Sequence, residues 1–163
     1  MTTLLTIAYR CHVAGSTLFA LMGLVYLLRR KFMPYHAVAL GRRWEDLDGP
    51  SRTLFLASMR IIGSAWLAIA LALLVLLRYG FRAGLQWSIY GVPLIGLTVA
   101  LPALLTVIHV KARTRASPPW PPLAMAVALF LTGLLLSVGD PCAGVRPGTA
   151  DPAAGRRSGG TIN

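Results

Sequence analysis

Four long apolar runs constrain what this chain of 163 residues can fold into. A helix needs about 20 mostly apolar residues to cross a hydrocarbon core about 30 Å thick. Segments at about 4–28, 53–77, 88–110 and 120–138 meet that requirement. They are continuously apolar rather than alternating, which favours helices over barrel strands. The sequence therefore predicts an all-α fold: an integral membrane four-helix bundle formed by residues 1–139.

The charge balance indicates a membrane surface rather than nucleic acid. Charged residues make up only 13% of the chain, against about 25% in an average soluble domain. Sixteen Lys and Arg outnumber five Asp and Glu, and the basic residues lie between the apolar runs. Loops that contact an anionic membrane surface show this distribution. No basic patch is interleaved with aromatic residues in a polar segment, so we expect membrane lipid as a partner and no nucleic acid.

The distribution of Lys and Arg also predicts the orientation of the bundle. The loops after the first and third runs lie on one side and carry nine cations: Arg29, Arg30, Lys31, Arg42, Arg43, Arg52, Lys111, Arg113 and Arg115. The other side carries five, three of them after residue 140. The positive-inside rule therefore places both basic loops in the cytoplasm and both termini outside.

The loop of residues 32–48 has a pattern of its own. Pro34 suits the first position of a helix. The apolar residues of the loop approximate a helical stripe made of Tyr35, Val38, Ala39, Trp44 and Leu47. We expect a short interfacial helix on the cytoplasmic face, ended by Gly49 and Pro50, with Ser51 capping the second span.

The composition changes after the fourth run. Residues 140–163 are rich in Gly, Pro, Ala and Arg and show no apolar periodicity. Such a segment buries too little apolar surface to fold by itself. We expect a coil-like C-terminal tail that is ordered only where a partner holds it.

Arg60 is a charge inside the second predicted span. It lies nine residues after Ser51, about 13 Å along a helix, and no Asp or Glu lies inside any span. One hypothesis makes Arg60 part of a site for an anionic headgroup, a quinone oxygen or a proton path. The favoured alternative is that it extends toward the cytoplasmic interface and pairs there with Glu45, Asp46 or Asp48.

The three histidines do not predict a haem or metal site. Paired haem ligands must share a depth, but His12 lies near the outer face, whereas His36 and His109 lie near the cytoplasmic side. Metal sites would need carboxylates or a closely spaced histidine pair, and the chain has neither in its spans. It also lacks nucleophile-elbow, zincin and phosphate-loop motifs. We expect no cofactor, no metal and no catalytic residues, which leaves His36, His109 and Arg60 as candidate ligand-binding residues.

Two pairings are predicted at the outer side. Arg10 and Cys11 lie near the outer end of the first span, and Asp140 and Cys142 follow the fourth. An Arg10–Asp140 ion pair fits this topology. A Cys11–Cys142 disulfide fits it too, with the outer compartment permitting oxidation, although a buried free thiol at Cys11 is the more common arrangement.

Small residues recur at four-residue spacing in the spans. The pairs are Ser16 and Ala20, Ser64 and Ala68, and Ala68 and Ala72. This spacing lets helix backbones approach closely. It serves either packing inside the bundle or docking of another membrane subunit.

The segment of residues 32–68 resembles a group of small uncharacterised bacterial inner-membrane proteins. The shared features are a Met-Pro-Tyr-His stretch, an Ala-Leu-Gly, a following Trp and a Met-Arg before small residues: here Met33 to His36, Ala39 to Gly41, Trp44, and Met59 to Arg60. The resemblance implies a multi-pass protein of the bacterial inner (plasma) membrane, with His36 and Arg60 on the same cytoplasmic side. It implies no activity.

The function favoured by these patterns is that of a non-catalytic accessory subunit packed against a larger membrane complex. Its basis is the abundance of apolar faces and small-residue spacings beside the absence of a catalytic motif. The first alternative is a lipid- or quinone-binding protein with a cytoplasmic-side pocket formed by Arg60, His36 and His109. A second alternative is a small channel or carrier.

Overall fold

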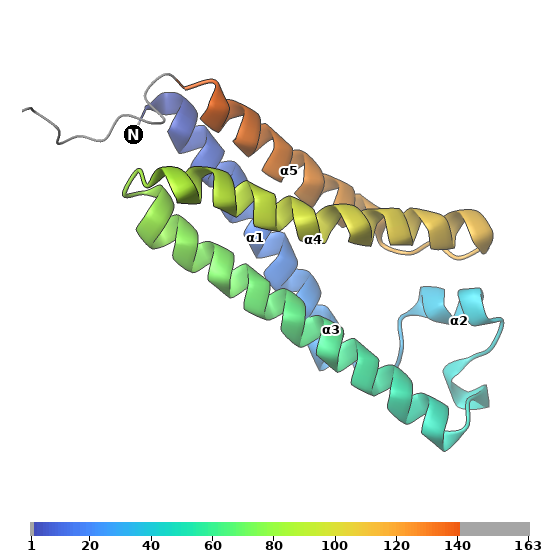
Figure 1. Cartoon of the computed structure of the whole chain (residues 1–163). Helices are drawn as coiled ribbons and strands as arrows, with labels where there is room; N and C mark the ends of the chain where they lie inside the picture. The colour runs from blue at the N-terminus through green and yellow to red at the C-terminus, as the bar shows by residue number, and fades with distance from the viewer. Residues whose placement is uncertain (1, 141–163) are drawn as a thin grey trace, which may run out of the picture.

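A computed structural model describes residues 2–140, and every regular element in that range is helical. The elements are α1 (Thr3–Leu28), α2 (Pro34–Leu40), the 3₁₀ turn η1 (Trp44–Asp46), α3 (Gly49–Val75), the π-helical segment η2 (Leu76–Phe81), α4 (Gln86–Arg113) and α5 (Trp120–Val138). Four helices, α1, α3 together with η2, α4 and α5, are long and apolar enough to cross a membrane (Figure 1). The prediction of an all-α chain with four long apolar helices is confirmed. The predicted tail, apart from Asp140, lies outside the described residues.

The long helices form two pairs, α1 with α3 and α4 with α5, which diverge toward one end of the bundle. Helix α1 packs along both α3 and α5, and α4 packs on α5, whereas α3 and α4 make few contacts. The start of α1, the end of α5 and the α3–α4 connection lie together at one end, which we call the turn end (Figure 1). The α1–α3 connection with α2, and the α4–α5 connection, lie at the opposite end, the α2 end. Figure 1 shows α4 and α5 moving away from α3 toward the α2 end, with α2 between them.

Glycines set the closest helix approaches. At the crossing of α1 and α3, a Cβ on Gly63 would lie 2.7 Å from the Leu27 nitrogen and 2.8 Å from the Gly23 carbonyl oxygen. Real Cβ atoms essentially never come so close to other atoms. Between α1 and α4, the ring of Phe130 fills the space beside Gly15 and Gly96. The glycines thus bring the backbones of α1 and α3 into contact and leave room for the Phe130 ring between α1 and α4.

Helix α3 begins earlier than predicted. Its cap is Asp48, whose carboxylate accepts hydrogen bonds from the Ser51 backbone N–H at 3.1 Å and the Ser51 hydroxyl at 2.6 Å. Gly49 and Pro50 form the first turn of α3, where a proline needs no backbone donor. The prediction that Ser51 caps this helix is therefore wrong: Asp48 is the cap, and Gly49 and Pro50 lie inside the helix.

The turn end has a feature that the apolar pattern does not reveal. After Val75 the helix widens into η2, in which the Arg82 N–H bonds the Leu77 carbonyl five residues back, at 3.2 Å. Gly84, at φ +70°, then reverses the chain into α4. This φ is left-handed and costs little only for glycine. The wider turn carries Phe81 into the core, where it is 2% exposed.

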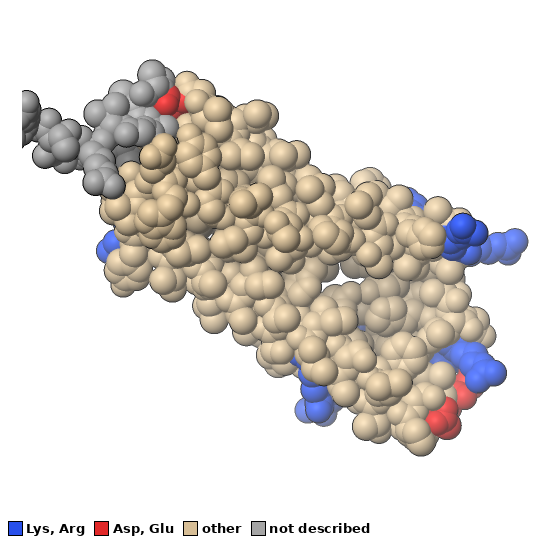
Figure 2. Space-filling view, in the orientation of Figure 1, with Lys and Arg blue, Asp and Glu red and all other residues tan. Residues whose placement is uncertain are grey.

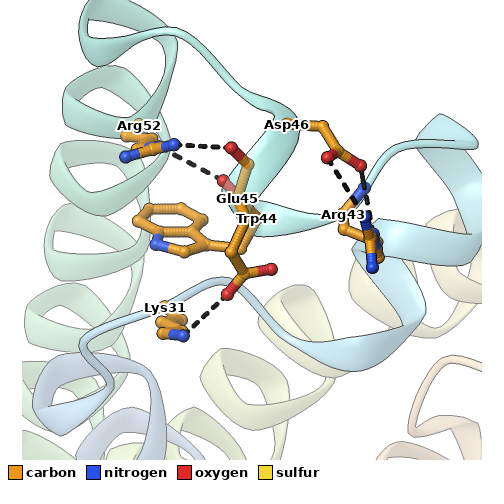
Figure 3. Close-up of polar contacts among 6 residues, drawn as sticks. All are labelled: Lys31, Arg43, Trp44, Glu45, Asp46 and Arg52. Atoms are coloured by element: carbon orange, nitrogen blue, oxygen red, sulfur yellow. Dashed lines mark hydrogen bonds and ion pairs between the residues drawn. The ribbon is translucent and has the colours of Figure 1, made fainter.

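The α1–α3 connection is folded and tied to α3. Pro34 is the first residue of α2, as predicted, but the helix ends at Leu40 with Gly41 at φ +66°, and the residues at Trp44 form the separate turn η1. The Arg52 guanidinium donates to the backbone carbonyls of Trp44 at 3.2 Å and Glu45 at 2.8 Å (Figure 3). A small apolar core lies beneath, formed by Phe32, Met33, Leu47 and Met59.

Candidate functional site

The α2 end contains an apolar cavity of about 520 Å³. It lies where α4 diverges from α3, and Figure 2 shows the surface hollowed in this region. Side chains from all five α-helices line it, most of them apolar, among them Met22, Ala39, Met59, Ile62, Val107 and Leu123. Ligand pockets of about 300–1,000 Å³ with mostly apolar walls are typical of small-molecule sites.

The polar groups of the cavity come mainly from α1 and α2. The hydroxyl oxygens of Tyr26 and Tyr35 lie 2.5 Å apart and share a hydrogen bond. His36 lies next to them, with its ring centroid 4.2 Å from that of Tyr35. Pro34 and Gly41 fix the ends of α2, so Tyr35 and His36 are held over the cavity by a helix of only seven residues.

Burial changes the titration of both α2 residues. It raises the pKa of the Tyr35 hydroxyl, and the hydrogen bond from Tyr26 adds to the increase. Burial also lowers the pKa of His36, because the charged imidazolium would lose solvation. The hydroxyl and the imidazole are therefore neutral near pH 7. The Nδ1 atom of His36 is buried and has no hydrogen-bond partner within residues 2–140.

Of the described residues that line the cavity, none is charged. Ser58 and Thr106 add hydroxyl groups, but Thr106 already donates to the Pro102 carbonyl at 2.8 Å. The cavity therefore accommodates an apolar body and offers neutral hydrogen-bonding groups at its α1–α2 wall.

The three predicted ligand-binding residues do not meet at this cavity. His36 lines it, whereas Arg60 on α3 and His109 on α4 are exposed and do not. The carboxylates predicted to pair with Arg60 have other partners: Glu45 bonds Lys31 at 2.8 Å, and Asp46 bonds Arg43 at 3.3 Å (Figure 3). Asp48 accepts hydrogen bonds from Ser51, so within residues 2–140 Arg60 pairs with none of the three predicted carboxylates.

Tyr26 and Tyr35 are the cavity residues that sequence reasoning missed. Tyr26 stands near the end of α1, at a position that fits an interfacial aromatic residue, and Tyr35 belongs to the stripe expected for α2. Their hydroxyls meet only because α2 folds back over the end of α1, and the spacing of nine residues gives no sign of that.

The predicted Arg10–Asp140 ion pair and Cys11–Cys142 disulfide involve residues of the turn end, and the ion pair stays a prediction. Asp140 is 5% exposed and accepts a hydrogen bond from the Thr2 hydroxyl. Arg10 is exposed on α1. Cys11 is half-buried, and Cys142 lies outside the described residues, so their disulfide stays a prediction.

His12 is more deeply buried than its predicted place near the outer face implied. Its side chain has no exposed surface, and its ring lies 5.7 Å from that of Phe81 and 5.8 Å from that of Phe130. A Cβ on Gly133 would lie 2.4 Å from the imidazole, so α5 approaches α1 closely there. Neither imidazole nitrogen has a hydrogen-bond partner within the described residues.

Comparisons of the chain with protein-family models, with curated proteins and with solved structures find no match.

Proposed function

We propose that this chain is a multi-pass membrane protein that binds the apolar part of a lipid-soluble molecule in the cavity at its α2 end. The observation that carries the proposal is the cavity itself, about 520 Å³ in volume and lined mainly by apolar side chains. A preformed apolar pocket stabilises a ligand by removing apolar surface from its surroundings. Four helices of membrane-crossing length supply the bundle around it.

The proposed orientation places this end at the cytoplasmic interface of a bacterial inner membrane. The exposed cations Arg29 and Arg30 on the α1–α3 connection, and Lys111 and Arg113 in the last turn of α4, lie at the same end as the cavity. Figure 2 shows basic side chains gathered at this end. Such residues interact favourably with the anionic headgroups of the cytoplasmic leaflet. In this arrangement α2 lies in the interface, and a ligand enters the cavity from the lipid phase.

The test compares ligand retention by two alanine-to-phenylalanine variants. Ala103 lines the cavity, whereas Ala68 is exposed on the outer face of α3. We expect native mass spectrometry of the protein in mild detergent to show a bound lipid-soluble molecule. Ala103→Phe should remove it, and Ala68→Phe, which adds the same side chain outside the cavity, should retain it. Equal occupancy in both variants, or no bound molecule in the wild type after incubation with a total membrane-lipid extract, would contradict the proposal.

The accessory subunit remains the second candidate function, and Arg60 is the observation that favours it. Arg60 lies eleven residues after the start of α3, about 16 Å along the helix, and its side chain is exposed. A charge at such depth is costly in lipid and is commonly matched by a partner. We expect a larger membrane protein to co-purify with the wild type and to be lost with Arg60→Leu. Arg78→Leu, which changes another exposed arginine of the same continuous helix near its end, should retain it.

The channel or carrier alternative is tested by reconstitution. The purified chain in liposomes should show no solute or ion flux above that of empty liposomes, because the described residues that line the cavity include no charged group to bind a coupling ion. Flux abolished by Ala103→Phe would favour the carrier over the binding protein.

A further inference from the structure

The chemistry of the cavity restricts the head of the ligand as well as its tail. An anionic head that entered the cavity would lose its hydration and meet no counter-charge, because none of the described lining residues is charged. Burying an unpaired charge is strongly unfavourable. Arg29, Arg30, Lys111 and Arg113 at this end are exposed and do not line the cavity. Lys31 and Arg43, on either side of α2, are 62% and 80% exposed and bond Glu45 and Asp46 instead. The cavity therefore suits a neutral head.

The tyrosine pair supplies a hydrogen-bond donor to that head. Two hydroxyl groups carry two hydrogens, and the contact between Tyr26 and Tyr35 uses one of them. Neither hydroxyl has another hydrogen-bond partner among the described residues, so one hydrogen stays available beside the cavity. A donor held against an apolar space is best satisfied by an acceptor such as a carbonyl oxygen.

Aromatic rings indicate the shape of the head. Five of the lining side chains have flat rings: Tyr26, Tyr35, His36, Phe55 and Trp66. The His36 ring lies 4.2 Å from that of Tyr35 and 6.3 Å from that of Phe55. Rings at such spacings favour offset or edge contacts with another planar ring. Bare acyl chains gain nothing specific from these rings, whereas a planar head does.

We infer that the ligand is of the quinone class: a neutral planar ring with carbonyl acceptors and an apolar tail, with a carbonyl oxygen accepting a hydrogen bond from the Tyr26–Tyr35 pair. The inference rests on the proposed function, because the tail occupies the apolar cavity described above. The quinone binds without transferring electrons and without forming a covalent bond.

The experiment measures binding of a decyl-substituted benzoquinone by quenching of tryptophan fluorescence, with Trp66 in the cavity wall. Decylbenzene and oleate are tested as competitors; the first lacks carbonyl groups and the second carries an anionic head. The variant Tyr26→Phe/Tyr35→Phe removes both hydroxyls and keeps both rings. Its control is Tyr9→Phe/Tyr90→Phe, which removes two hydroxyls outside the cavity lining. Ala103→Phe fills the cavity with a phenyl ring, so the fluorescence quenching that remains in this variant does not come from binding in the cavity.

We expect the quinone to bind the wild type and the control variant equally, with little signal from Ala103→Phe. Loss of one neutral hydrogen bond should weaken quinone binding by about threefold to tenfold in Tyr26→Phe/Tyr35→Phe. The same double variant should bind decylbenzene as tightly as the wild type does, because decylbenzene has no carbonyl group for the hydroxyls to contact. Where the double variant does not fold, Tyr35→Phe alone is measured, and a loss of quinone affinity with unchanged decylbenzene affinity is again the expected result.

Two results would overturn the inference and leave the proposed function standing. In the first, decylbenzene binds as tightly as the quinone, and removal of the hydroxyls changes neither affinity. In the second, oleate displaces the quinone at lower concentration than decylbenzene does. If the quinone gives no signal that Ala103→Phe reduces, the inference fails, and the ligand retention of Ala103→Phe and Ala68→Phe in native mass spectrometry decides whether the proposed function fails with it.

Discussion

The α1–α3 crossing yields a prediction whose magnitude follows from atomic distances. Gly63→Ala would place a Cβ 2.7 Å from the Leu27 nitrogen, 2.8 Å from the Gly23 carbonyl oxygen and 3.1 Å from the Tyr26 Cβ. The first two neighbours are backbone atoms, so no side-chain rotation relieves the contact, and the helices must move apart. Overpacking of this kind costs about 1–3 kcal/mol, and rigid backbone neighbours indicate the upper part of that range.

An opposing contribution must be subtracted. Alanine is favoured over glycine inside a helix by about 0.5–1 kcal/mol. The expected net loss in the free energy of unfolding for Gly63→Ala is therefore about 2 kcal/mol. Gly91 in α4 is the matched control, because a Cβ there has no neighbour within 4 Å and Gly91→Ala keeps only the helix-propensity gain.

The assay is reversible unfolding in mixed micelles titrated with sodium dodecyl sulfate and followed by circular dichroism. The two variants should move in opposite directions, separated by about 3 kcal/mol, the difference being the steric cost alone. Equal effects of Gly63→Ala and Gly91→Ala would refute the claim that backbone contact at Gly23 and Gly63 holds α1 against α3.

Three further predictions test other parts of the structure. Asp48→Ala should lower the melting temperature because α3 loses its cap, whereas Asp48→Asn, which keeps a capping oxygen without the charge, should not; a loss in both would mean that the charge matters instead. Arg52→Met should release η1 from α3, so that trypsin cleaves after Arg42 and Arg43 faster than in the wild type, and an unchanged cleavage rate would show that the two carbonyl contacts do not hold the segment. His12→Leu should raise the free energy of unfolding by about 1–3 kcal/mol, because it removes two buried nitrogens that have no hydrogen-bond partner in the described part of the chain; destabilisation in the same micelle assay would indicate a hydrogen-bonding role for the imidazole.

The sequence was a good guide to the helices because lipid imposes a length that is visible in the apolar pattern. Residues 53–77, for example, fall inside the continuous helix Gly49–Phe81. The cap was missed because Asp48 and Ser51 are both good capping residues, and the choice depends on Gly49 and Pro50 entering the helix. The wide turn of η2 was missed because a π-helical segment leaves no mark on hydropathy.

The candidate site was less predictable because it depends on which way side chains face. Arg60, His36 and His109 share a side of the predicted bundle, but depth along a helix says nothing about rotation around it. Two of the three face outward. Ser64, Ala68 and Ala72 also have exposed side chains, whereas glycines without a recognised pair in the sequence, Gly23 and Gly63, form the close crossing.

The position of the cavity follows from the unequal packing of the four long helices. The glycine crossing draws α1 against α3. Nearer the turn end, Gly133 and Gly15 let α5 approach α1 at His12 and Phe130, and Gly96 lets α4 approach Phe130 of α5. Within residues 2–140, no such close contact joins α3 to α4, so their separation grows away from the turn that connects them. Helix α2 partly fills the widening space with Tyr35 and His36, and the remaining volume is the cavity. Gly63→Ala, which moves α1 away from α3, should therefore also shift Tyr26 at the cavity. Ligand binding should weaken in Gly63→Ala and stay unchanged in Gly91→Ala.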